Sequence, residues 1–119
     1  MAAYNVCFQH MVESAFSELS HRYELPNPLC YSHNFILQCL YYASEPMTLA
    51  QISRESGQAL PNVSIAANSL QENGLIAREK DEQDHRKYLV TLTEKGKKLC
   101  DEYITEYLSD IVDKLYNGL

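Results

Sequence analysis

The sequence contains no tryptophan, and only four glycines, four prolines and four cysteines occur among its 119 residues. It shows no internal repeat, low-complexity tract or flexible linker, so its length fits a single domain. The cysteines have neither a C-x-x-C spacing nor a paired framework, and the four histidines are scattered. No P-loop, G-x-S-x-G or dinucleotide-binding motif occurs. We therefore expect no enzymatic activity, no metal and no cofactor.

Positive charge is also scarce. Ten Lys and Arg residues against sixteen Asp and Glu give a net charge of −6, which argues mildly against a nucleic-acid partner. No Lys or Arg occurs between Ser56 and Ala77. Seven of the ten basic residues lie between Arg78 and Lys98, where only five acids accompany them. The acids gather instead in the C-terminal segment, so the sequence indicates one weakly basic end and one acidic end.

No stretch is apolar enough to cross a membrane. Residues 25–44 carry no formal charge, but two prolines, two asparagines and a glutamine make them too polar for a span. The N-terminus lacks the charged and apolar regions of a signal peptide. We expect a cytoplasmic protein with reduced thiols.

Both ends of the chain have helical apolar patterns. Residues 2–23 form one helix, which ends before Pro26 because a residue that precedes proline is pushed out of the helical region. Residues 32–43 are apolar on most sides, which predicts a buried helix. From Glu94 onward, an apolar stripe of about six turns is longer than a small monomer covers easily. The two apolar faces comprise Phe8, Met11, Val12, Ala15, Phe16, Leu19 and Tyr23, and Leu99, Tyr103, Leu108, Ile111, Val112, Leu115 and Leu119.

The stretch from residue 47 to residue 93 predicts two helices and a hairpin. Thr48 and Gln51 have the spacing of a capping box, and Gly57 can end this first helix in a left-handed conformation. A second helix begins near Pro61 and ends at Gly74. Its buried stripe comprises Val63, Ala66, Ala67 and Leu70. Residues 76–80 and 88–92 alternate as antiparallel strands around a charged loop, and Thr93 caps a further helix.

The buried stripe turns a neutral face of the second helix outward, comprising Pro61, Ser64, Ile65 and Asn68, with Asn62 and Ser69 at its flanks. Asparagine can bond an adenine edge, serine can bond several bases, and isoleucine can touch a thymine methyl. For the helix alone, an ordinary solvated surface is an equally good interpretation.

The hairpin changes this balance. The run Asp84-His85-Arg86, followed by residues 89–93 and Gly96, resembles the wing signature of the MarR (multiple antibiotic resistance regulator) family. Leu70, Gly74, Leu75 and Ile76 match the same pattern at the same spacing. The resemblance covers residues 35–99 well. It implies a mainly α fold with a small β-hairpin wing, a winged helix-turn-helix with N- and C-terminal dimerisation helices.

The resemblance also implies the partners and the site. It implies a homodimer that forms through residues 1–30 and 97–119, with residues 32–96 as the lobe that binds a pseudo-palindromic operator in double-stranded DNA. It implies that Arg86 reaches a minor groove and that Asp84 supports Arg86. We expect Lys87, next to Arg86, to add a second charge contact from the wing. The resemblance places Pro61, Asn62, Ser64 and Ile65 where members of the family contact the major groove, and the helical period of the outward face adds Asn68 and Ser69 to these candidates. The function so implied is a sequence-specific transcriptional regulator, taken as a repressor.

Two forms of control are open. Cys7 lies early in the first helix, where one branch of the family senses peroxides, but no basic residue near it in sequence lowers its pKa, and an inert packed cysteine is the alternative. Nine tyrosines could line a pocket for a small aromatic effector, although core and dimer packing explain most of them equally well.

A different class of function stays open as well. The acidic net charge and the uncharged helix face are also compatible with a winged-helix protein-interaction module that does not bind DNA. Such a module has little use for a basic wing tip, whereas Arg78, Lys80, Arg86 and Lys87 are all present. We therefore favour the regulator.

Overall fold

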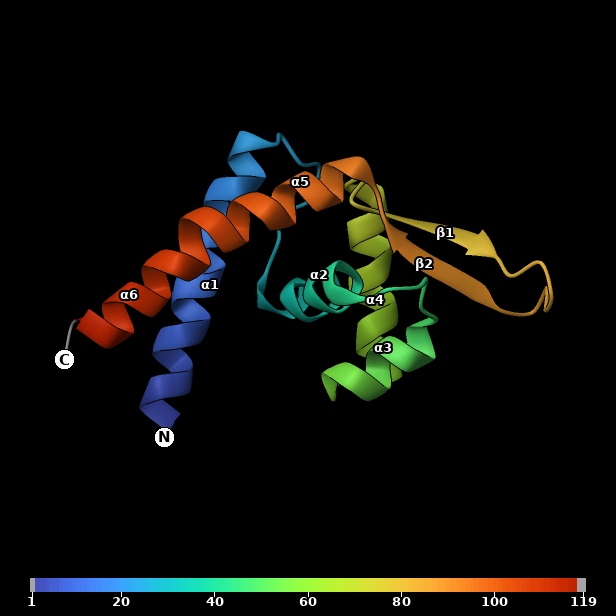
Figure 1. Ribbon diagram of the computed structural model, residues 1–119, viewed down its shortest axis with the longest axis horizontal. Coiled ribbons are helices and arrows are strands. Elements are labelled where there is room, and N and C mark those ends of the chain that lie inside the picture. Colours follow the sequence, from blue (N-terminus) through green and yellow to red (C-terminus); the bar gives the residue numbers. More distant parts are fainter. Residues whose placement is uncertain (1, 118–119) are drawn as a thin grey trace.

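The protein consists of a compact lobe with a hairpin on one side and two helical ends on the other (Figure 1). The computed structural model describes residues 2–117, with the side chains of residues 12–106, 109, 112, 113 and 115–117. The elements in chain order are α1 (Ala2–Arg22), α2 (Tyr31–Tyr42), α3 (Leu49–Ser56), α4 (Leu60–Glu72), β1 (Ile76–Lys80), β2 (Tyr88–Leu92), α5 (Glu94–Glu102), the π-helical η1 (Tyr103–Leu108) and α6 (Ser109–Asn117). The predicted fold class is confirmed.

Local chemistry sets the bounds of α3 and α4 as predicted. The Thr48 hydroxyl accepts from the Gln51 N–H at 3.2 Å, and the Gln51 side chain accepts from the Thr48 N–H at 2.9 Å. Gly57 ends α3 at a φ of +74°, in the left-handed region. Pro61 lies in the first turn of α4. The stripe of Val63, Ala66, Ala67 and Leu70 is buried, which fixes the rotation of α4 about its axis.

The hairpin forms in the predicted register, from Ile76 opposite Leu92 to Lys80 opposite Tyr88. Its second strand also pairs with the chain just before α3. Val90 donates to the Met47 carbonyl at 2.7 Å, and Met47 donates to the Val90 carbonyl at 3.2 Å. This bridge was not predicted, and it ties the base of the wing to the start of the helix-turn-helix.

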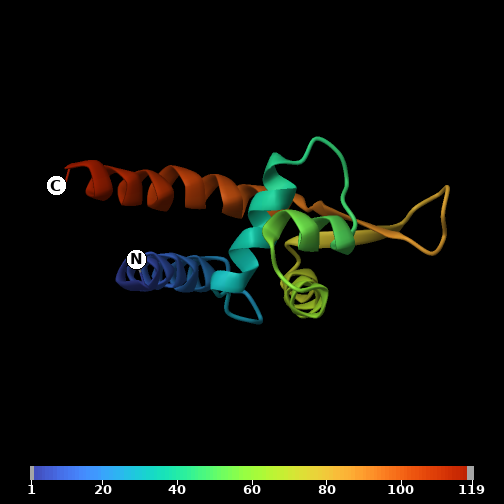
Figure 2. The same ribbon diagram turned by 90° about the horizontal axis from the view of Figure 1, so that it is seen from below.

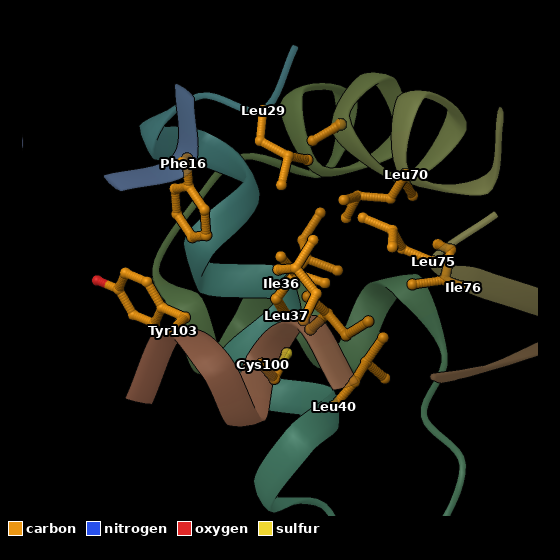
Figure 3. Packing of buried hydrophobic residues seen from close by; sticks show 14 of the residues in the cluster. Phe16, Leu29, Ile36, Leu37, Leu40, Leu70, Leu75, Ile76, Cys100 and Tyr103 are labelled. Carbon is orange, nitrogen blue, oxygen red and sulfur yellow. The ribbon is translucent and has the colours of Figure 1, made fainter. Parts of the chain in front are cut away.

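The core lies where α2 crosses between α4 and α5 (Figure 3). Ile36, Leu37 and Leu40 of α2 are buried against residues of the other elements, including Leu70, Leu75, Ile76, Leu99 and Cys100. At the edge of this cluster, Phe16 of α1 stacks on Tyr103 with ring centroids 4.8 Å apart. The same packing therefore joins the lobe to both helical ends.

The prediction that α2 is buried on nearly all sides is wrong for its last turn. Tyr42 is 69% exposed, and Tyr41 and Cys39 are only partly buried. Cys39 and Tyr41 still pack partly against the core, whereas Tyr42 is the exposed apolar side chain of this turn. The start of α2 is more buried than its composition indicates. His33 is 5% exposed, and its Nδ1 accepts a hydrogen bond from the Cys30 N–H at 2.8 Å.

The C-terminal segment is not the single regular helix that was predicted. Six residues wind as the π-helix η1, and the Ser109 N–H bonds to the carbonyl of Ile104, five residues earlier. Arg22 of α1 spans the start of this segment, since its Nη1 lies 3.1 Å from Glu102 and 3.0 Å from Glu106. These pairs are partly exposed, so each contributes little stability, but together they hold the end of α1 against η1.

The C-terminal apolar stripe is covered only in its first part. Leu99 and Tyr103 are buried, whereas Val112 and Leu115 of α6 are 42% and 40% exposed. Leu108, Ile111 and Leu119 lie outside the described side chains. Figure 2 shows α1 and the C-terminal helices extending away from the lobe on the side opposite the wing. Between residues 2 and 117, no helix is long and apolar enough to cross a membrane.

Gly96 marks the closest approach of α5 to the end of α4. A Cβ there would lie 2.1 Å from the Leu75 carbonyl oxygen, which the Thr93 N–H holds at 3.0 Å. We expect Gly96→Ala to lower the free energy of unfolding by about 3 kcal/mol, the upper end for overpacking. Urea unfolding measures this. Gly57→Ala is the control, because a Cβ at this position meets no atom within 4 Å. Its only cost is the left-handed φ, which should lower the free energy of unfolding by about 1 kcal/mol. An equal or smaller loss at Gly96 would contradict the packing.

Burial lowers the pKa of His33 below its ordinary value of 6.5, and the acceptor role of Nδ1 requires the neutral ring. The unfolded chain therefore takes up a proton first as the pH falls. We expect the stability to be level above about pH 6.5 and to decline as the pH drops from there to the folded-state pKa. Thermal unfolding from pH 8 to pH 5 should show this decline in the wild type and not in His33→Gln. His85→Gln, at the exposed wing tip, should keep it.

Candidate nucleic-acid interface

The outward face of α4 matches the prediction from its helical period. Pro61, Asn62, Ile65 and Asn68 are exposed, and Ser64 and Ser69 are partly buried. Ile65 is 69% exposed, although it is a large apolar side chain. The stripe on the opposite side of α4 imposes this exposure, because a turn of the helix that buried Ile65 would expose Val63 and Ala66. The result is a neutral surface with one apolar projection.

Asn68 is not a free side chain on this surface. Its Oδ1 accepts a hydrogen bond from Nη2 of Arg78 at 2.8 Å. Arg78 lies on β1, where it pairs with the buried Val90. The chain reverses at Gly74, which has a positive φ, so β1 runs back beside α4 and the Arg78 guanidinium reaches Asn68. Sequence reasoning counted Arg78 among the basic residues of the hairpin and did not place it at the helix. The sequence feature that could have indicated this contact is the separation of only four residues between Gly74, where the chain reverses, and Arg78.

The wing tip is a hydrogen-bonded turn that holds Arg86 in solvent. Asp84 Oδ1 accepts from the Arg86 N–H at 3.1 Å and lies 3.5 Å from the Arg86 Nε. The Asp84 carbonyl accepts from the Lys87 N–H at 2.9 Å, and the Lys87 carbonyl accepts from the Asp81 N–H at 2.9 Å. The Arg86 side chain is 93% exposed. Asp84 therefore contacts both the backbone and the side chain of Arg86.

An open groove of about 610 Å³ runs between the start of α2 and the outward face of α4. Its walls include Asn62, Ile65 and Ser69 from α4. On the other side, the Cys30 Sγ lies 3.1 Å from the Ser32 Oγ and 3.3 Å from the His33 Nδ1. Half of the predicted contact residues thus line a concave surface, whereas Asn68 lies beside the hairpin.

The cysteines differ in their environments. Burial, and then the nearby Asp101, raise the pKa of Cys100 to about 12, so its thiol stays protonated. Burial, and then Glu55, also raise the pKa of Cys39. The side chain of Cys7 lies outside the described residues, so its proposed sensing role is untested. Among the described residues, no group of three or more His, Cys, Asp or Glu side chains is arranged to hold a metal ion.

Most described tyrosines have packing roles. Tyr103 stacks on Phe16, and Tyr31 packs edge-on against Phe35 at 5.2 Å. A smaller groove of about 220 Å³ lies between the end of α2, β2 and α5 and includes Tyr41 in its wall. The Tyr41 hydroxyl donates to Asp101 at 2.5 Å, and this bond raises its pKa. A pocket lined by several tyrosines is not found among the described grooves.

The chain resembles known proteins both in the sequence of its lobe and in its overall fold. The MarR family model matches residues 31–88, which extend from α2 to the first residue of β2. The chain is similar to MepR of Staphylococcus aureus in its DNA complex, at 22% identity and a TM-score of 0.76, over 99% of this chain and 83% of that one. A MarR transcriptional regulator from Methanosarcina mazei Go1 is 20% identical with a TM-score of 0.74, over 100% and 84% of the two chains.

ZitR of Lactococcus lactis is 26% identical with a TM-score of 0.65, over 78% of this chain and 62% of that chain. No curated protein sequence matches the chain. The family resemblance inferred from the wing signature is confirmed, because the MarR family model matches residues 31–88, which build most of the lobe.

Proposed function

We propose that this protein is a sequence-specific DNA-binding transcriptional regulator that acts as a homodimer. The observation that carries the proposal is the pairing of an exposed, neutral α4 face with a wing tip that holds Arg86 93% exposed. A solvated arginine on a hydrogen-bonded turn suits insertion into a narrow minor groove, where the negative potential is enhanced. The α4 face offers polar and apolar groups of the kind that read base edges in the major groove.

The homodimer is supported by the exposed apolar side chains at the C-terminal end. Val112, Leu115 and Tyr116 of α6 are 42%, 40% and 79% exposed, and α6 lies at the end of the molecule opposite the wing (Figure 1). Burial of this face against a second copy would place two α4 helices in successive major grooves, about 10 base pairs apart on a pseudo-palindrome. We take the direction of control as repression, since a dimer on such a site excludes other proteins from that DNA.

The lack of Lys and Arg on α4 has a measurable consequence. Phosphate neutralisation rests on the wing, where Arg86 and Lys87 are exposed in each protomer. About four such contacts per dimer give a slope of log affinity against log salt of roughly −4, which is shallow for a regulator. Specificity then depends on direct contacts of α4 more than on charge.

The test is titration of the purified protein against the DNA upstream of its own gene, by fluorescence anisotropy at two salt concentrations. We expect saturable binding with the shallow slope, and a loss of about tenfold or more in Arg86→Ala, because a hydrogen bond to a charged group contributes about 1.5–3 kcal/mol. Lys98→Ala, which removes one charge from an exposed position on α5, is the matched control.

Repeating the titration with mild peroxide, in the wild type and in Cys7→Ser, tests thiol control. Repeating it with small aromatic acids tests ligand control.

Equal affinity for the upstream DNA and for random DNA, unchanged in Arg86→Ala, would contradict the proposal. That result favours the interaction module, which the neutral α4 face and the net charge of −6 also support.

A further inference from the structure

The contact between Arg78 and Asn68 changes what the recognition face can read. An isolated asparagine bonds adenine bidentately, because its Oδ1 accepts from N6 and its Nδ2 donates to N7. In this structure the Oδ1 is occupied by Nη2 of Arg78 at 2.8 Å. Arginine only donates, so the carboxamide must turn its oxygen to the guanidinium and its NH₂ away from it.

Arg78 brings a charge that its own surroundings do not neutralise. Arg86 pairs with Asp84, but no described carboxylate forms an ion pair with Arg78. Its Nε is buried and has no partner among the described residues. The guanidinium is therefore held at the surface of α4 by a neutral amide, and it retains its positive charge beside a helix that has none of its own.

The pair of Arg78 and Asn68 lies on the outward face of α4. Asn68 follows Ser64 by four residues and Ile65 by three, so the three side chains share one side of the helix. It lies about 10 Å along the axis from Pro61, since each residue advances the helix by about 1.5 Å. This position is one to two turns beyond the residues at the start of α4, in the direction of the hairpin.

We propose that Arg78 and Asn68 act as one contact that selects guanine. After their mutual bond, donors dominate the pair: the Asn68 NH₂ and the remaining N–H groups of Arg78 outnumber the one lone pair left on the Asn68 Oδ1. Guanine presents two acceptors to the major groove, N7 and O6, whereas the N6 amino group of adenine would face a donor. Arg78 is thus a specificity-determining residue that lies outside the recognition helix. The inference rests on the proposed DNA-binding function.

The experiment is selection of binding sites from random-sequence duplexes by the wild type and three variants. The wild type should prefer guanine by about tenfold at one position in each half-site. Asn68→Ala should lose the preference at that position alone, which identifies it. Arg78→Met frees the Asn68 Oδ1, so the preference there should switch from guanine to adenine. Lys80→Met, which removes the same charge two residues further along β1, should keep guanine.

Thermal unfolding of each variant confirms that the hairpin is intact, and the switch of base is a readout that a structural tie alone does not produce. The inference is overturned if Arg78→Met keeps guanine, or if it weakens all sites uniformly, as loss of a backbone contact would. A wild type that selects a palindrome without such a guanine overturns this inference and leaves the regulator intact. A wild type that selects no site overturns both.

Discussion

The burial of one stripe of α4 is the constraint on which the rest of the surface depends. Val63, Ala66, Ala67 and Leu70 pack against α2 and α3, and three of the four are so fully enclosed that α4 cannot rotate without opening the core. The small alanines allow the close approach. Once this stripe is fixed, the helical period decides which side chains face solvent, including the otherwise costly exposure of Ile65.

The hairpin supplies the positive charge that α4 lacks. The α4 surface is neutral because the chain carries no Lys or Arg between residues 56 and 77. The left-handed turn at Gly74 starts β1 beside the end of α4, and Arg78 then returns to Asn68. At the other end of the hairpin, Asp84 holds the turn that exposes Arg86. The Met47–Val90 bridge ties this hairpin to the chain just before α3.

The sequence predicts the elements well where their ends are set by local chemistry. Thr48 with Gln51, Gly57, Pro61 and Thr93 act through atoms a few residues away, so their spacing carries the information. The exposed end of α2 at Tyr42 was missed because composition does not show where the packed neighbours stop. The π-helical turn after Tyr103 was missed because its apolar spacing also fits a regular helix.

The candidate site was predictable in outline for the same reason. A period of 3.6 residues is enough to identify the outward face of α4. The role of Asp84 beside Arg86 was implied by the family resemblance of the wing and not by the spacing alone. The partner of Asn68 is not visible in the sequence, because Arg78 reaches it across a chain reversal. The hydrogen bond turns the Asn68 oxygen toward the guanidinium, and the inference that the pair selects guanine rests on this orientation.

The most direct test of this account is methylation interference on a selected site. Dimethyl sulfate modifies guanine at N7 in the major groove and adenine at N3 in the minor groove. The account predicts that methylation blocks binding at guanines in two major-groove segments about 10 base pairs apart, and at adenines in the minor grooves that flank them. Interference confined to one segment, or absent from the flanking minor grooves, would contradict a dimer that reads DNA with α4 and the wing together.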